Sequence, residues 1–282
     1  MPRGRKVSSV AGFIKIVFGD TPSNNQAIFY RGHASAREFK LLPSLFRPKQ
    51  IGGIETYVGD EDQIFREIIV ANPQDFTEDS STLERLVRMQ HHGLPTRLLD
   101  ITSNPLMALY FACSGCPEKP GQVITFKVPK AEVKFFDSDT VSCVANLAQL
   151  SNTHKDALNL SQNRDDFNQS EPAQRLLHFI KHEKPYFQDV IDPNHMNKVF
   201  CVRSKLSNSR KLVQSGAFFL FGINGVIDES NGTITVLRTD IQAKEKKRIL
   251  NELDRLNIND RTVFPFIENS ARYIRTKFAT TV

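Results

Sequence analysis

The chain has 282 residues, of which 40% are hydrophobic and 9% aromatic, and this composition excludes a disordered polypeptide. Its 21 phenylalanines and lack of tryptophan predict a phenylalanine-rich core. The formal net charge of +6 permits nucleic acid or another polyanion as a partner but does not require one. Because no segment has the length of a membrane helix or the pattern of a signal peptide, we expect a soluble, cytoplasmic protein with reduced thiols.

Two patterns could bind a metal, and both are incomplete. Cys113 and Cys116 have the spacing of a metal or redox pair, but no second pair completes a zinc site. His178 and His182 are four residues apart on a predicted helix, without the glutamate of a metalloprotease helix between them. We therefore expect no metal, and a metal-dependent hydrolase ranks last among the functions considered.

The chain begins with a predicted helix from Ser8 or Ser9 to Val17. A buried strand over residues 27–30 follows and ends in Arg31-Gly32-His33, where we expect a loop to begin. After an irregular stretch with two prolines, residues 60–70 are predicted to form a helix.

The next helix has a clear start and a clear end. Ser81 and Glu84 have the spacing of a capping box, and Gly93 supplies the positive φ that follows many helices. Residues 94–101 are predicted to be extended, because a residue before proline avoids the α region. Asn104 and Pro105 then form an N-cap and N1 pair that opens another helix.

The second half alternates strands with helices around one polar stretch. Residues 130–170 are rich in Asn, Ser and Asp, and we expect an insertion packed on the outside of a single domain spanning residues 1–282. The remaining predicted elements are strands at 122–128, 199–202, 217–223 and 234–237 and helices at 173–182, 241–256 and 268–277.

Polar and ionisable residues concentrate between Gln90 and Cys113, around the ends of two predicted helices. Such a helix start offers unpaired amides to an anion, so the stretch is a candidate ligand site. A purely structural interpretation stays open. Arg97 and Asp100 could form an ion pair that fixes the loop, Thr102 or Ser103 could cap the following helix, and His91 and His92 could cap the preceding one.

Four groups of residues together resemble the FRG domain, named for its Phe-Arg-Gly motif. Tyr30 replaces the phenylalanine of that motif, and the resemblance covers roughly residues 10–270. The groups are Tyr30-Arg31-Gly32, the run from Gln90 to Asp100, the run Thr102-Ser103-Asn104-Pro105 with Ala108 and Phe111, and Arg210 with the run from Gln214 to Phe218. FRG proteins are found in bacteria and phages, and the family name describes a sequence pattern rather than an activity.

A more distant resemblance is to ADP-ribosyltransferases of the Arg-Ser-Glu type. Those enzymes place an arginine at the end of an early strand, a Ser-Thr-Ser-like motif before a helix and a glutamate at a late strand. Arg31 is similar to the first element, and Thr102-Ser103 to the second. Gln214-Ser215-Gly216 stands where the third should be, so Gly216 replaces the expected glutamate.

The second resemblance implies roles in handling NAD. Arg31 would bind the pyrophosphate, Ser103 or Thr102 the nicotinamide ribose, and a nearby carboxylate would stabilise an oxocarbenium-like state. Asp100, Gln214, or a glutamate near Glu171 or Glu183 could replace the missing one, and His91 and His92 could supply acid–base chemistry. The resulting catalytic candidates are Arg31, His91, His92, Asp100, Ser103 and Gln214. The cofactor-binding candidates are Tyr30, Arg31, Gly32, Arg97, Thr102, Ser103 and Phe111.

We therefore predict one α+β domain with a split or mixed central sheet flanked by helices, similar to ADP-ribosyltransferases. Its predicted function is that of an NAD-handling enzyme, an ADP-ribosyltransferase or NAD glycohydrolase, acting as a bacterial or phage toxin or defence effector. The alternative is a module without catalysis that binds a nucleotide, a nucleic acid or a protein. A nucleic-acid surface would involve the basic residues Lys244, Lys246, Lys247 and Arg248.

Overall fold

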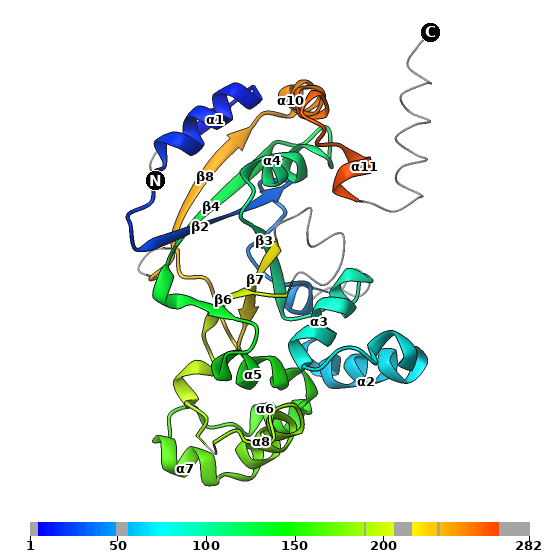
Figure 1. Ribbon diagram of the computed structural model, residues 1–282, viewed down its shortest axis with the longest axis vertical. Helices are drawn as coiled ribbons and strands as arrows, with labels where there is room; N and C mark the ends of the chain where they lie inside the picture. The colour runs from blue at the N-terminus through cyan, green and yellow to red at the C-terminus, as the bar shows by residue number, and fades with distance from the viewer. Residues whose placement is uncertain (1–4, 49–55, 189, 206–215, 230–231, 265–282) are drawn as a thin grey trace.

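The computed structural model describes residues 5–48, 56–188, 190–205, 216–229 and 232–264. They form one mixed sheet of eight strands with helices packed around it, which confirms the predicted α+β class (Figure 1). The strand order is β1-β8-β4-β2-β3-β7-β6-β5. The strands are β1 (Arg5–Val7), β2 (Gln26–His33), β3 (Leu98–Thr102), β4 (Gly121–Pro129), β5 (Val133–Phe135), β6 (Val199–Arg203), β7 (Gly216–Phe221) and β8 (Thr235–Ile241).

The sheet consists of two halves that are joined by a single residue pair. β2 pairs with β4 along its whole length, and β3 pairs with β7 along its whole length. Between β2 and β3, however, only Tyr30 and Thr102 are in register. Of the predicted alternatives, a split or a mixed sheet, the mixed sheet is confirmed, and β2 and β3 diverge at its centre after this one pair.

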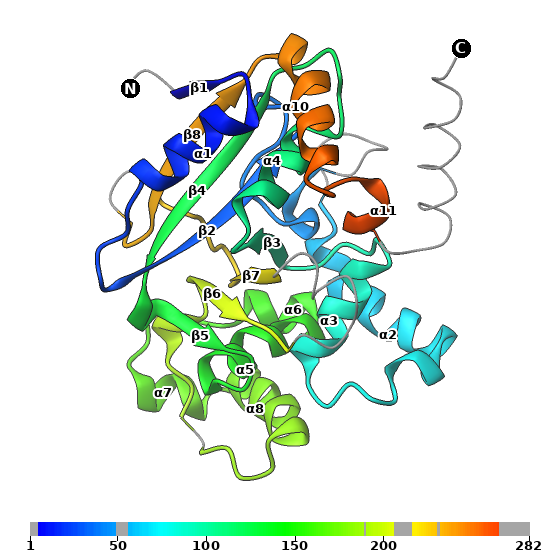
Figure 2. The same ribbon diagram turned by 45° about the horizontal axis from the view of Figure 1, so that its top comes forward.

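The upper half of the sheet is covered by α4 and by one helix from each end of the chain. α4 (Pro105–Cys113) lies against β2 and β4, and α10 (Ala243–Arg255) packs on α4. α1 (Val10–Gly19) lies beside α10, as both views show (Figures 1 and 2). Their apolar side chains form one buried cluster that includes Phe13, Leu109 and Ile249.

Glycine allows α4 to approach the sheet closely. A Cβ atom on Gly32 would lie 2.1 Å from the carbonyl oxygen of Ala108, and one on Gly121 would lie 2.2 Å from that of Ala112. Both distances are far shorter than van der Waals contact, and the obstructing atoms are backbone. The third residue of the Tyr-Arg-Gly motif is therefore required by the packing of α4 on β2.

The lower end of the molecule is mainly helical (Figure 1). Its elements are α2 (Glu61–Ala71), α3 (Thr82–His91), α5 (Asp139–Ala145), α6 (Asn152–Asp156), α7 (Arg164–Gln169) and α8 (Glu171–Glu183). Val144, Leu147 and Leu150 are fully buried in the largest hydrophobic cluster, together with Leu98 of β3 and Leu220 of β7. The apolar side chains of residues 141–150 thus complete the core under β3 and β7, while an insertion at residues 130–170 stays a prediction.

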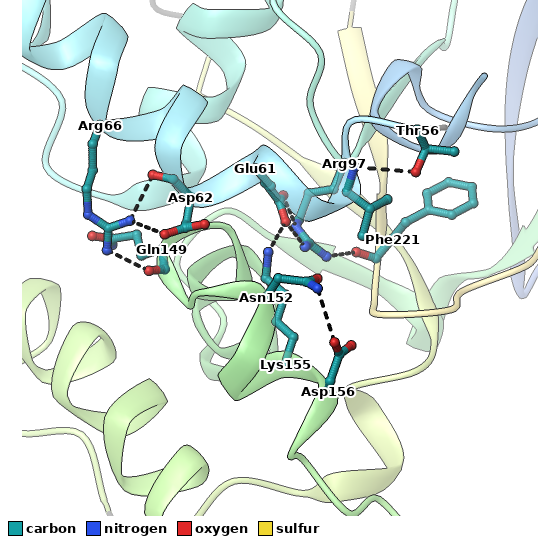
Figure 3. A network of polar contacts seen from close by, with 11 residues as sticks. Thr56, Glu61, Asp62, Arg66, Arg97, Gln149, Asn152, Lys155, Asp156 and Phe221 are labelled. Atoms are coloured by element: carbon teal, nitrogen blue, oxygen red, sulfur yellow. Dashed lines mark hydrogen bonds and ion pairs between the residues drawn. The ribbon is translucent and has the colours of Figure 1, made fainter. Parts of the chain in front are cut away.

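One buried carboxylate links α2, α6 and the lower half of the sheet (Figure 3). Glu61 accepts hydrogen bonds from Nε of Arg97 at 2.7 Å, from Nη2 of Arg97 at 2.5 Å and from Nζ of Lys155 at 2.6 Å. The remaining terminal nitrogen of Arg97 donates to the carbonyl of Phe221 at 2.7 Å. The Arg97–Asp100 ion pair does not form, because Arg97 points into this cluster and away from the loop.

Several local predictions are confirmed. Ser9 caps α1, Gly93 has a φ of 86°, and the side chain of Asn104 accepts from the amides of Leu106 and Met107 at the start of α4. The predicted capping box is half formed. Ser81 accepts from the Glu84 amide, whereas the Glu84 carboxylate accepts from the Ser80 amide.

Other local predictions differ from the structure. β2 does not end at Tyr30 but continues through His33, because β4 supplies a partner for each of those residues. A short helix that the sequence analysis did not predict, α11 (Asp260–Val263), follows α10. The predicted final helix at 268–277 lies outside the described residues. In the part of the chain that the structure describes, no helix has the length and apolarity needed to cross a membrane.

Replacing Gly32 by alanine should destabilise the protein by about 3 kcal/mol, because the added methyl group meets the backbone of α4. Gly19→Ala is the matched control, since a Cβ atom at Gly19 would meet nothing within 4 Å. Thermal unfolding followed by circular dichroism measures both. Equal melting temperatures for the two variants would contradict the close approach of α4.

Glu61→Gln should cost about 3–5 kcal/mol of unfolding free energy, because it leaves Arg97 and Lys155 buried without a compensating charge. Asp62→Asn on the same helix removes only an exposed pair with Arg66 and should cost less than about 1 kcal/mol. Urea denaturation of the two variants gives the comparison. A loss of stability for Asp62→Asn as large as that for Glu61→Gln would refute the assignment.

Candidate functional site

A pocket of about 300 Å³ opens where β2 and β3 diverge. Its walls come from both halves of the sheet, from α3 and α4, and from the segment between β2 and α2. The lining residues are Tyr30, Arg31, Gly32, His33, Ala34, Phe39, Arg47, Val87, Gln90, His91, Asp100, Ile101, Thr102, Phe111, Gly216 and Phe218. The interruption of the sheet at its centre thus creates a space with polar groups from β2 on one side and β3 on the other.

Arg31 spans the gap between the two strands. Its Nη1 donates to the carbonyl oxygen of Asp100 at 2.6 Å, and its Nε donates to Nε2 of His33 at 3.2 Å. Burial lowers the pKa of Arg31 to about 10, an effect that Asp100 opposes and Arg47 reinforces. The guanidinium therefore keeps its charge at neutral pH, and its position is fixed by two neutral acceptors.

His33 is held as a neutral imidazole. It is 1% exposed, and because its Nε2 accepts from Arg31, its proton lies on Nδ1. Burial lowers the pKa of His33 to about 3, and Arg31, Arg238 and Arg47 contribute further positive charge. Among the described residues, Nδ1 has no hydrogen-bond partner.

Arg47 brings a second guanidinium to the pocket. Its Nε donates to the carbonyl oxygen of Leu42 at 2.9 Å, which holds the side chain against its own loop. Burial lowers the pKa of Arg47, and Asp100 opposes that shift. Neither Arg31 nor Arg47 forms an ion pair with any carboxylate of the described residues. Their positive charges are therefore available to an anion that enters the pocket.

Asp100 is the carboxylate of the pocket. Its Oδ2 accepts from Nε2 of Gln90 at 2.6 Å, and the hydroxyl of Thr96 donates to Oε1 of Gln90 at 2.6 Å. Of the other carboxylates considered, Glu183 accepts from the Thr82 amide and Glu171 lies beside His154. Neither of them lines the pocket.

Aromatic side chains form much of the remaining wall. Phe39 is 41% exposed at the rim, with its ring edge-to-face with His33 at a centroid distance of 6.0 Å. Phe111 of α4 and Phe218 of β7 complete the apolar lining with Tyr30. The pocket therefore combines aromatic side chains with two cations and one anion in its lining.

The structure gathers most of the sequence-predicted residues at this pocket and places others elsewhere. Tyr30, Arg31, Gly32, His91, Asp100, Thr102 and Phe111 line it. Exposed His92 caps the end of α3 through its backbone amide, and exposed Ser103 is not a lining residue. Arg97 lies in the buried Glu61 cluster, while Gln214 falls outside the described residues.

Residues that the sequence interpretation missed also line the pocket. His33 directly follows the Arg-Gly pair, so the continuation of β2 would have indicated it. Gln90 begins the motif but was not selected, although it lies only six residues before Thr96, to which it is hydrogen-bonded across the turn. Arg47 and Phe39 lie on an irregular segment without periodicity, and no sequence signal identifies them.

Lys246 does not belong to a basic surface, in contrast to its exposed neighbours Lys244, Lys247 and Arg248. It is 2% exposed, and its Nζ donates to the carbonyl oxygens of Ala34, Gly115 and Cys116 at 2.7, 2.8 and 3.0 Å. This lysine ties α10 to the end of α4 and to the residue that follows His33. Its role is therefore to fix one wall of the pocket.

The chain was compared with protein families, curated proteins and solved structures. Residues 26–120 match the FRG domain. No curated protein and no solved structure matches the chain. The FRG match contains β2, β3, α3 and α4 and so carries Arg31, Arg47, Gln90 and Asp100. It is shorter than the resemblance over residues 10–270, and the likeness to ADP-ribosyltransferases has no support from any match.

Metal ligands do not gather anywhere in the described ranges, in which no group of three or more His, Cys, Asp or Glu side chains is placed to hold an ion. Cys113 is buried, and burial raises the pKa of its thiol to about 12. His178 and His182 lie on α8, far along the chain from the FRG match.

His33 should make the protein sensitive to acid. Below its ordinary pKa of 6.5 the unfolded chain binds a proton at His33, whereas the folded chain does not until the pH approaches 3. This difference costs up to about 1.4 kcal/mol of stability for each pH unit in that window. His33→Gln keeps an acceptor for Arg31 but does not titrate, so its unfolding free energy should fall less steeply from pH 6.5 to pH 4. Parallel pH profiles for the two proteins would contradict the buried neutral imidazole.

Proposed function

We propose that the pocket between β2 and β3 binds a nucleotide, and that NAD is the first one to test. The observation that carries this proposal is the set of hydrogen-bond partners of Arg31 and Arg47. Both are held by neutral acceptors, and neither is paired with a carboxylate of the described residues, so both can bind phosphate oxygens. Arginines placed only for stability would be expected to end on carboxylates, as Arg97 does at Glu61.

The apolar part of the pocket supports the same proposal. A nucleotide carries an aromatic base, and Phe39, Phe111 and Phe218 offer ring surfaces for it next to the arginines. The volume of about 300 Å³ is at the lower end of the range for small-molecule sites.

Asp100 supports turnover of NAD over simple binding. Cleavage breaks the bond between the nicotinamide nitrogen and C1′ of the ribose, and the electron pair leaves with nicotinamide. Water then adds to C1′, giving ADP-ribose and a proton. A carboxylate near C1′ stabilises the positive charge that develops there, and Asp100 is the group in the pocket that could replace the glutamate missing at Gly216. Without turnover, the pocket is that of a nucleotide-binding module.

Binding of AMP, adenosine and NAD, measured by isothermal titration calorimetry, tests the proposal. AMP should bind more tightly than adenosine, and Arg47→Ala should weaken AMP binding about tenfold or more while leaving adenosine binding nearly unchanged. Arg31→Lys should also weaken AMP binding, because lysine lacks the planar guanidinium that can donate two hydrogen bonds to one phosphate. Arg175→Ala, which removes one exposed arginine on α8, is the control for net charge.

Failure of the wild-type protein to bind any of these nucleotides would overturn the proposal. Release of nicotinamide from NAD, followed by chromatography, separates enzyme from binding module. Turnover that Asp100→Asn abolishes supports the enzyme, and binding of intact NAD without turnover supports the module.

A further inference from the structure

We infer that Asp100 binds the ribose hydroxyls of the ligand and that Thr96, through Gln90, fixes its carboxylate for this purpose. The pocket would then select ribonucleotides over deoxyribonucleotides. This inference rests on the proposed function, since it specifies which nucleotides the same pocket accepts. It assigns positioning roles to Gln90 and Thr96, of which the first lines the pocket and the second lies behind it.

A chain of hydrogen bonds sets the orientation of Gln90. Thr96 is 1% exposed, and its Oγ1 accepts from the amide of Leu98 at 3.3 Å. Its own proton is therefore directed to Oε1 of Gln90, at 2.6 Å. With Oε1 occupied in this way, the NH₂ group of Gln90 faces Asp100. The reverse orientation would place two oxygen acceptors 2.6 Å apart.

The result is a carboxylate with one oxygen occupied and one available. Oδ2 of Asp100 accepts from Gln90, and Oδ1 has no hydrogen-bond partner among the described residues. Asp100 is exposed and lines the pocket, and an ionised carboxylate only accepts hydrogen bonds. Its ligand partner must therefore be a donor, and a phosphate would be repelled.

The neighbouring arginines limit which donor this can be. Arg31 donates to the backbone carbonyl of Asp100 itself at 2.6 Å, so the guanidinium proposed to bind phosphate is held by the same residue that carries the carboxylate. A ligand that satisfies both carries an anion and a donor a short distance apart. The phosphate and the vicinal hydroxyls of a ribonucleotide have this arrangement, whereas a deoxyribonucleotide or a free inorganic phosphate lacks part of it.

The same residues also connect the two sides of the pocket. The amide of Thr96 donates to the hydroxyl of Ser44 at 3.2 Å, and its carbonyl accepts from the amide of Leu45 at 3.3 Å. Ser44 and Leu45 lead directly into Arg47. The backbone of Thr96 thus holds the segment that carries Arg47. Its side chain, through Gln90, fixes the orientation of the Asp100 carboxylate. These contacts explain why a buried threonine stands at position 96 of the motif.

Binding of AMP, 2′-deoxy-AMP and 3′-deoxy-AMP to the full chain tests the inference by calorimetry. The wild-type protein should bind AMP about tenfold or more tightly than at least one deoxy analogue, since a hydrogen bond to a charged group is lost. Asp100→Asn should reduce that ratio to near one. The ratio of AMP to adenosine, which reports phosphate binding by the arginines, should not fall in Asp100→Asn, because the variant removes a negative charge that repels the phosphate.

Thr96→Val removes the hydroxyl at nearly constant volume and should reduce the preference for AMP over the deoxy analogue, without changing the ratio of AMP to adenosine. A purely structural role would weaken all ligands alike. Thr239→Val, a buried threonine of β8 away from the pocket, is the matched control. If Thr96→Val does not fold, Gln90→Met removes the same hydrogen bond to Asp100 from a partly exposed side chain.

Equal affinity for AMP and both deoxy analogues, with the arginine dependence intact, would overturn this inference and leave the proposed function standing. A preference for ribose that survives Asp100→Asn would overturn it as well. Absence of binding for every nucleotide would overturn the proposed function and this inference with it.

Discussion

The divergence of β2 and β3 after one residue pair is the constraint on which the site depends. A continuous ladder beyond Tyr30 and Thr102 would place Asp100 opposite Gly32 and leave no space between the strands. Instead the guanidinium of Arg31 donates a hydrogen bond to the carbonyl oxygen of Asp100, a backbone group that would otherwise lack a partner on that side. The gap is thus stabilised by a side chain, and the charge that spans it also faces the pocket.

The residues of the motif divide into those that build the site and those that support it. Gly32, Arg97 and Asn104 act on the scaffold, through the approach of α4, the Glu61 cluster and the cap of α4 respectively. Arg31, Gln90 and Asp100 face the pocket. A motif can therefore contain several charged residues although only some of them can contact a ligand, and burial separates the two groups.

Much of the fold could be predicted from the sequence, because its signals are local. Caps, a glycine with positive φ and the periodicity of buried residues indicated most helices and strands within a few residues. The partner of Arg97 was not predictable, since Asp100 is three residues away in sequence and Glu61 is 36 residues away. Arg47 and Phe39 could not be found because they lie on an irregular segment whose place depends on backbone contacts with Thr96. The burial of residues 141–150 was hidden by the polar composition around them.

The order of strands in the sheet has a consequence for how the protein is made. β3 needs β7 as its neighbour and β4 needs β8, and both partners are encoded more than 100 residues later. The region matched by the FRG domain, residues 26–120, contains β2 and β3 but ends before β4, so a ribosome that has completed it has made neither β4, the partner of β2, nor β7, the partner of β3. Contacts of such long sequence separation slow folding, and the eight-stranded sheet can be completed only after β8 has been synthesised. The strands in the region that matches the FRG domain therefore depend on partner strands that lie outside it.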